Sequence, residues 1–153
     1  MEQLMIRPYQ PQDWPRLAAI HDAARLLELR LAGLEDAFLP LEVAAEREDL
    51  FGYTLRVAEW AGQAAAFAAY TEDELAWLYV DPAYMRRGIG SRLVRYVQAN
   101  TAARPLTIEV LAGNAPALAL YRAMDFQPVD ARTGAMPGNE AFRVTVHVLV
   151  FNG

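Results

Sequence analysis

Apolar residues change their spacing along the chain, and the changes divide it into helical and extended stretches. In the first part they recur every three or four positions, as one face of an α-helix requires; the positions are Leu17, Ile20, Ala24, Leu27, Leu31 and Leu34. Pro11 and Asp13 precede this pattern, and Asp13 is a favourable N-cap. Gly33 and Pro40 interrupt the region, so we expect one long helix and then shorter helical pieces up to about residue 50.

Short apolar or alternating runs dominate the rest of the chain and predict strands. Together with an N-terminal run they cover residues 4–8, 54–60, 64–70, 75–80, 106–111, 126–132 and 142–150. The run at 75–80 is apolar at nearly every position, as in a central strand covered on both faces. Two further helices are expected, one from Gly88 and one from Asn114 to about Met124. A polar loop is expected over Gly134–Glu140.

The order of these elements predicts an α/β fold of the α+β kind, built on one mixed sheet. The order is strand, two helices, three strands, helix, strand, helix and two strands. Consecutive strands joined by tight turns are antiparallel, whereas strand–helix–strand units form right-handed parallel crossovers. No repeat, low-complexity tract or linker interrupts the 153 residues, so residues 1–153 are expected to form a single domain.

Composition removes several classes of chemistry. The chain has no cysteine, which excludes disulfides, cysteine-based zinc sites and a cysteine acyl-enzyme. It also has no lysine, which excludes Schiff-base chemistry and a P-loop. The one serine, Ser91, stands in a Gly-rich helix start rather than in a nucleophile elbow, which argues against a serine hydrolase.

Charge and hydropathy set expectations for location and partners. The net charge of −5 disfavours non-specific nucleic-acid binding. The N-terminus Met1-Glu2-Gln3 lacks the basic and apolar regions of a signal peptide, and no apolar run approaches the roughly 18 residues of a membrane span. We therefore expect a cytoplasmic protein with neither a nucleic-acid nor a membrane partner. The sequence leaves a homodimer open.

The stretch from Val80 to Val94 combines features of an anion-binding loop. Gly88 and Gly90 lie between the apolar strand and an amphipathic helix, and glycines there allow a tight turn and close approach of a ligand. The first amides of the helix have no partner within it, so they can bind phosphate. Arginines add positive charge at positions 86, 87, 92 and 95. The alternative is a plain Gly-containing turn with solvated arginines; a dinucleotide fold is disfavoured because the third glycine of G-x-G-x-x-G is missing.

This loop resembles motif A of the GNAT superfamily of acetyl-CoA-dependent N-acetyltransferases, Gln/Arg-x-x-Gly-x-Gly/Ala. The resemblance continues into motif B at 108–126, so that both motifs lie within residues 75–128, and the order of elements agrees. Met85 departs from the pattern where the family has Gln or Arg, and Arg86 and Arg87 are expected to compensate. Asp125 stands where the family has Gly, and Asp tolerates a left-handed helix end.

The resemblance implies a fold with splayed central parallel strands and acetyl-CoA as cosubstrate, with no metal. The backbone of Leu78, Tyr79 and Val80 would pair with the pantetheine arm, as in β-augmentation. The loop residues would hold the pyrophosphate; they are Arg86, Arg87, Gly88, Ile89, Gly90 and Ser91. Asn114 would either contact the coenzyme, cap the following helix or do both.

The same resemblance assigns catalytic roles. Tyr121 would protonate the leaving thiolate, the alternative being a buried core aromatic. Glu109, twelve residues earlier in an apolar strand, would be the general base; the same spacing is seen in the branch that acetylates protein N-termini. The alternative for Glu109 is an exposed and idle glutamate at the strand edge, and Glu74 or a water molecule remains the competing base. Transfer to the amine would be direct, in a ternary complex.

The acceptor and two alternative functions stay open. A small-molecule or peptide primary amine is implied as acceptor. A non-catalytic acyl-CoA-binding sensor or partner module is the main alternative to an acyltransferase, and a binder of another nucleotide is a weaker one. Between Asp22 and Asp49 eight acidic residues stand against three arginines, which predicts either an acidic wall that attracts a cationic acceptor or a solvated helix face.

Overall fold

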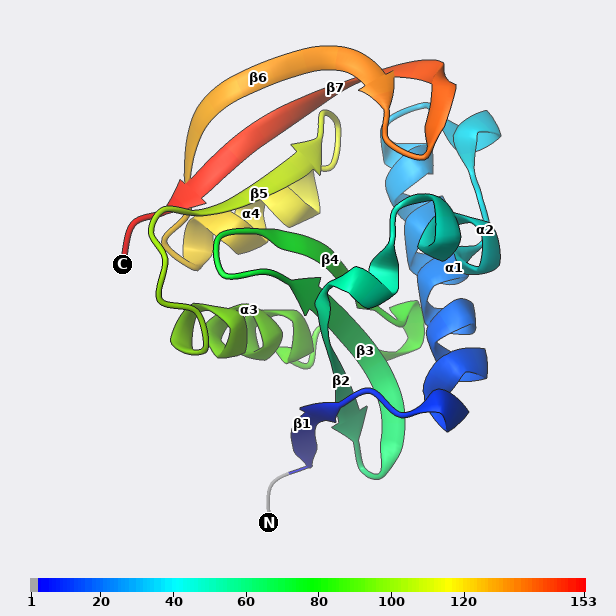
Figure 1. Cartoon of the computed structure of the whole chain (residues 1–153), viewed down its shortest axis with the longest axis vertical. Helices are drawn as coiled ribbons and strands as arrows, with labels where there is room; N and C mark the ends of the chain where they lie inside the picture. The colour runs from blue at the N-terminus through cyan, green and yellow to red at the C-terminus, as the bar shows by residue number, and fades with distance from the viewer. Residues whose placement is uncertain (1–2) are drawn as a thin grey trace.

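The computed structural model describes residues 3–153, and its elements follow the expected order (Figure 1). The signal-peptide prediction rests partly on Met1 and Glu2, and these two N-terminal residues lie outside the described residues. The strands are β1 (Leu4–Pro8), β2 (Thr54–Trp60), β3 (Gln63–Tyr70), β4 (Leu75–Val80), β5 (Leu106–Leu111), β6 (Gln127–Met136) and β7 (Asn139–Phe151). The α-helices are α1 (Trp14–Leu31), α2 (Leu41–Arg47), α3 (Ile89–Ala99) and α4 (Ala115–Ala123). Short 3-10 turns are η1 (Pro11–Asp13), η2 (Glu35–Ala37), η3 (Leu50–Gly52) and η4 (Pro82–Tyr84).

The strands form two antiparallel sheets, so the expectation of one mixed sheet is wrong. One sheet has the order β1-β2-β3-β4 and the other β5-β7-β6. β4 and β5 meet only at a parallel bridge between Glu74 and Thr107, where the Thr107 N–H donates to the Asp73 carbonyl at 2.9 Å. Beyond this bridge, side chains of both strands line a common cavity instead of pairing their backbones. The structure is therefore an α+β fold in which the edge strand β4 of one sheet faces the edge strand β5 of the other.

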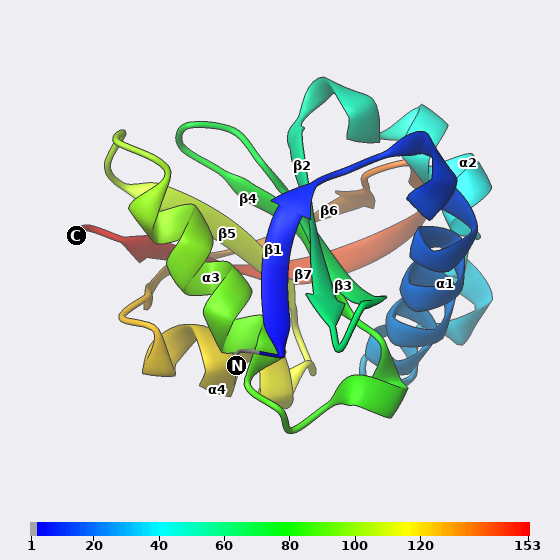
Figure 2. The same ribbon diagram turned by 90° about the horizontal axis from the view of Figure 1, so that it is seen from below.

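Helices cover the first sheet on both faces (Figure 2). On one face α3 buries Ile89, Leu93, Val94 and Val97 against alanines of β3, and α4 adds Tyr121. On the other face α1 and α2 pack on alternate residues of the same strands, including Phe67 and Trp77. The first of these apolar clusters also contains Ile108 and Leu149 of the second sheet. The near-continuous apolar character of 75–80 is explained by this two-sided cover.

The start and the inner face of α1 differ from the sequence expectation. Asp13 precedes the helix, but its carboxylate accepts the Gln10 N–H and two bonds from Arg7, each at 2.8 Å, and does not cap α1. Leu27 and Leu31 are exposed at 38% and 53%, whereas Leu29 is fully buried. In its second half, α1 therefore buries a different face from the one predicted. Polar residues of that half point toward the interior of the molecule. Within residues 3–153 no helix has the length and apolar character needed to cross a bilayer.

The expected loop at Gly134–Glu140 is wrong, because strands occupy most of it. β6 extends to Met136 and pairs with β7 from Asn139, which leaves Pro137 and Gly138 as the turn. Met136 and Val144 are buried in a third apolar cluster with Leu29 and Leu111, and this packing holds the residues in an extended conformation. Gly138 has a φ of 76°, a left-handed conformation that glycine adopts without strain.

Candidate active site

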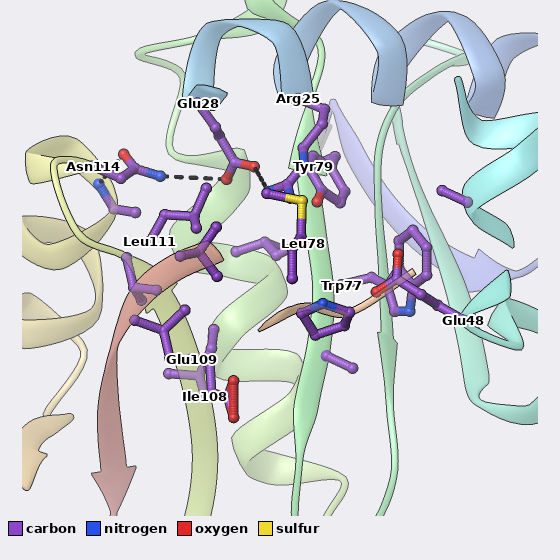
Figure 3. Close-up of a pocket in the computed structure, with 18 of the residues that line it drawn as sticks. Arg25, Glu28, Glu48, Trp77, Leu78, Tyr79, Ile108, Glu109, Leu111 and Asn114 are labelled. Carbon is purple, nitrogen blue, oxygen red and sulfur yellow. Dashed lines mark hydrogen bonds and ion pairs between the residues drawn. The ribbon is translucent and has the colours of Figure 1, made fainter. Parts of the chain in front are cut away.

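A cavity of about 160 Å³ lies between the two sheets and is closed by α1, α2, the start of α4 and the β6–β7 turn (Figure 3). Most of the residues that line it are apolar, and charged groups from separate elements converge on it. The ionisable side chains that line it are His21, Arg25, Glu28, Glu48, Tyr79, Glu109 and Tyr121. Convergence of polar groups in one apolar cavity is the usual form of a small-molecule site.

Two strand edges border this cavity without strand partners of their own. β4 pairs with β3 through Phe67↔Tyr79 and Ala66↔Val80, which leaves its other edge directed toward β5. β5 is likewise the edge of its sheet. Side chains of Leu78 and Tyr79 line the cavity. An extended ligand with amide groups can add to such an edge by backbone hydrogen bonds.

The loop between β4 and α3 has the geometry of an anion cradle. Gly88 is the N-cap of α3 with a φ of 76°, and a Cβ placed there would have no heavy atom within 4 Å. The Arg92 N–H donates to the Gly88 carbonyl at 3.1 Å, so the amides before Arg92 are directed out of the helix start. The Arg86 residue is exposed, also with a left-handed φ of 64°. Arg87 instead stacks on Trp60 and Tyr84, with its Cζ 5.4 and 5.1 Å from the ring centres.

The predicted coenzyme residues thus fall into two neighbouring groups. Leu78, Tyr79 and Asn114 line the cavity, whereas 86–91 form the end of the loop before α3 and the first residues of that helix. Val80 lies between them, since a Cβ at Gly90 would lie 3.8 Å from its Cγ2. Met85, the departure from motif A, is about half exposed.

Asn114 connects the cavity to α4. Its Oδ1 accepts the Ala117 N–H at 3.3 Å, so the expected N-cap role is confirmed. Its Nδ2 donates to Glu28 Oε2, also at 3.3 Å, which joins the start of α4 to α1 (Figure 3). The predicted left-handed end of α4 is confirmed as well, with Asp125 at φ 71°.

Tyr121 lies in the cavity wall two turns along α4. It is 5% exposed, and its ring packs edge-on against Phe126 with centroids 5.6 Å apart. Burial raises the pKa of the Tyr121 phenol, and the nearby Glu28 carboxylate raises it further. The hydroxyl therefore stays protonated at neutral pH and is able to donate a proton.

The two candidate bases are neighbours, although only one lines the cavity. Glu109 is exposed and forms part of the cavity wall, whereas Glu74 stands at the bridge to β5. Burial raises the pKa of Glu74, and the charge of Glu109 adds to this. Glu109 is thus close enough to influence the protonation of Glu74.

Sequence reasoning did not place His21 or Arg25 in the site, and it placed Glu28 only within the acidic segment. Arg25 Nη1 forms a salt bridge to Glu28 Oε1 at 3.0 Å. Burial raises the pKa of Glu28, while Arg25 opposes the rise. His21 is buried beside Tyr79, and burial lowers the pKa of its imidazole. The available signal was their spacing: residues 21, 25 and 28 share one helix face.

Only some of the eight acidic residues between Asp22 and Asp49 lie at the cavity, as the expected acidic wall requires. Of its eight acidic residues, Glu28 and Glu48 line the cavity and the other six do not. Glu48 is the C-cap residue of α2 and faces the β6–β7 turn. The Arg47 guanidinium donates to the Gly138 carbonyl at 2.9 Å, and the Asn139 side chain donates to the Ala37 carbonyl at 3.0 Å. α2, η2 and the turn therefore form one wall.

Gly138→Ala is expected to destabilise this wall. A Cβ there would lie 3.0 Å from Glu48 Cγ and would also hold a left-handed φ, so unfolding in urea should show a loss of about 2 kcal/mol. Gly33→Ala is the matched control, because Gly33 has a φ of 71° with no heavy atom within 4 Å of the added Cβ. It should lose only about 1 kcal/mol. Equal losses of unfolding free energy in Gly138→Ala and Gly33→Ala would mean that the close contact with Glu48 does not destabilise the protein.

The comparisons with known proteins agree with this geometry. The acetyltransferase (GNAT) domain family matches residues 47–128, and the chain belongs to this family. Over 61 residues it is 44% identical to the N-alpha-acetyltransferase RimI of Mycobacterium tuberculosis, covering 40% of this chain and 39% of that protein. The chain thus spans about two fifths of the length of this curated relative.

Solved structures share the fold over nearly the whole chain. A GCN5-related N-acetyltransferase from Rhodopseudomonas palustris superposes with a TM-score of 0.81 at 22% identity, covering 100% of this chain and 98% of the other. A ribosomal-protein-alanine N-acetyltransferase from Brucella melitensis gives 0.68 at 23% identity, covering 97% and 99%. The likeness establishes a GNAT-like α+β fold.

Proposed function

We propose that this protein is an acetyl-CoA-dependent N-acetyltransferase that acts on a primary amine by direct attack in a ternary complex. The observation that carries the proposal is the cavity between the facing edges of β4 and β5, which holds Tyr121 and Glu109. Membership of the GNAT family supports it. The RimI relative is named for acetylating α-amino groups, which favours an amine acceptor here.

The coenzyme would lie along β4 and end at α3. Backbone groups of Leu78–Val80 would pair with the amides of its pantetheine arm, in the gap where the two strands diverge from their bridge. The pyrophosphate would be held by the amides of Gly88–Ser91 and by Arg86. Arg87 would act indirectly, because its guanidinium already stacks on Trp60 and Tyr84. Asn114 would lie near the thioester end.

The reaction needs a proton acceptor for the amine and a proton donor for the leaving sulfur, and residues in or beside the cavity supply both. The acceptor ammonium gives a proton to a carboxylate, Glu109 or Glu74, and the free amine attacks the thioester carbonyl. Backbone N–H groups near Val80 stabilise the oxyanion. The C–S bond then breaks, and Tyr121 donates its proton to the leaving sulfur. The nitrogen loses its second proton, which passes through water to restore the Tyr121 phenol. The products are the N-acetylated amine and CoA.

The pH profile separates the two candidate bases. If Glu109 is the base, Glu109→Gln should lower the plateau of kcat by about a hundredfold, the usual scale for a lost general base. If Glu74 is the base, the same substitution should keep the plateau and move the acidic limb to lower pH, because removing a negative charge lowers the pKa of Glu74. Glu74→Gln, measured alongside, should lower the plateau of kcat by about a hundredfold only if Glu74 is the base. Unchanged profiles in both variants would favour a water molecule as base.

An acceptor panel scored by CoA release tests the proposed function. The chain has no cysteine, so a thiol reagent reports CoA without a background from the protein. The panel should include a peptide with a free N-terminal alanine, polyamines, amino acids and small aromatic amines. Release above the rate of spontaneous hydrolysis is expected with at least one class. Tight acetyl-CoA binding without release would support the sensor or partner module instead.

A further inference from the structure

We infer that Glu48 binds a second positive charge on the acceptor, so that the preferred substrates are amines with a cationic group beyond an apolar segment. This inference rests on the proposed function, because it concerns the acceptor of that reaction. It is carried by the position of Glu48, its lack of a salt-bridge partner and the charge balance of the cavity.

Glu48 differs from Glu28, the other residue of the acidic segment that lines the cavity. Glu28 is paired with Arg25 at 3.0 Å and also accepts a hydrogen bond from Asn114. Among residues 3–153, Glu48 has no salt bridge and its carboxylate accepts no hydrogen bond, although its side chain lines the same cavity. Burial raises the pKa of Glu48, and the nearby Arg25 only partly opposes this. Such a carboxylate gains free energy when a cationic ligand pairs with it.

The position of Glu48 is fixed by the wall that carries it. It ends α2, and the left-handed turn at Gly138 lies directly against its side chain. Arg47 holds the same turn through its bond to the Gly138 carbonyl. The Glu48 side chain is therefore packed against the β6–β7 turn, which restricts its position, as a selective contact requires.

The reacting end of the cavity lies elsewhere. Figure 3 shows Asn114 and Glu48 on opposite sides, with Leu78 and Trp77 between them, and Glu109 on the strand β5. A single molecule that spans this arrangement needs an amine at the β4–β5 gap, an apolar middle and a cation at Glu48. Linear diamines have this form.

The charge balance of the cavity favours the same class. Its lining contains one guanidinium, that of Arg25, against the carboxylates of Glu28, Glu48 and Glu109. His21 adds no charge at neutral pH, because burial lowers the pKa of its imidazole. A doubly charged acceptor compensates the excess of negative charge, whereas a monoamine leaves part of it unbalanced in a site partly shielded from water.

The experiment compares each diamine with the monoamine of the same length and shape. Putrescine is paired with pentylamine and cadaverine with hexylamine, so that a methyl group replaces the distal ammonium. In the wild-type protein kcat/KM should be higher for the diamine of each pair, and Glu48→Gln should reduce that preference about tenfold or more. Glu46→Gln is the matched control, since Glu46 is exposed on the same helix and does not line the cavity; it should keep the preference.

Calorimetric binding of putrescine gives a second readout that does not depend on turnover. Loss of binding in Glu48→Gln, with Glu46→Gln unaffected, supports the inference even if no amine releases CoA, in which case only the proposed function fails. A wild-type protein that does not distinguish diamine from monoamine overturns the inference while CoA release upholds the function. A preference that survives Glu48→Gln, or that is lost equally in Glu46→Gln, also overturns it. Circular dichroism of each variant establishes that it is folded.

Discussion

Gly88→Asp should abolish acetyl-CoA binding measured by calorimetry while leaving the protein folded. Gly88 caps α3 in a left-handed conformation with open space beside its Cα, in the loop where the pyrophosphate would lie. A carboxylate there would occupy that space and repel phosphate at the positive end of the helix.

Two variants separate the causes of that loss. Gly88→Asn has nearly the shape of Asp without the charge, and Asn also tolerates a left-handed φ; it should retain partial binding. Gly33→Asp places the same carboxylate at another open left-handed glycine, following α1, and should bind acetyl-CoA as the wild type does. Wild-type affinity in folded Gly88→Asp would mean that the loop does not hold the coenzyme.

Tyr121→Phe should lower kcat by about a hundredfold or more and leave coenzyme affinity unchanged, because it removes only the proton donor. The ring packing against Phe126 survives the substitution, so folding should be little affected. Measurements at saturating acceptor and acetyl-CoA separate this effect from binding.

Tyr79→Phe is the control for the second tyrosine of the cavity. Tyr79 is also a cavity residue whose pKa burial raises, but it lies on β4 against His21 and Phe67. Its substitution should leave kcat close to the wild-type value. A wild-type kcat in Tyr121→Phe would assign protonation of the thiolate to another group and return Tyr121 to a purely structural role.

Local patterns predicted the parts of the fold that depend on local chemistry. The bounds expected for β2, β4 and β5 agree with the structure, because apolar runs between turn residues define them. The cap at Asn114 and the left-handed Asp125 followed from the preferences of single residue types. The motif at Gly88 was visible because glycine spacing and a following amphipathic helix are both local features.

Tertiary packing decided the features that were predicted wrongly. The extension of β6 to Met136 depends on a cluster with Leu29 and Leu111, far apart in the chain. The orientation of α1 depends on the cavity, which accepts Arg25 and Glu28 from the helix face. Neither the extension of β6 nor the orientation of α1 can be predicted from the residue periodicity of one segment, because each depends on contacts with residues of another segment. The separation of the two sheets likewise depends on what fills the space between them.

The single bridge between Glu74 and Thr107 has a mechanical consequence. A continuous ladder would fix the angle between two neighbouring strands through many backbone hydrogen bonds, whereas here one bridge acts as a pivot for the facing edges. The two sheets are also joined by the apolar cluster shared by α3, α4, β3 and β5, in which contacts are non-directional. Substitutions in that layer can therefore open or narrow the cavity without breaking a strand pair.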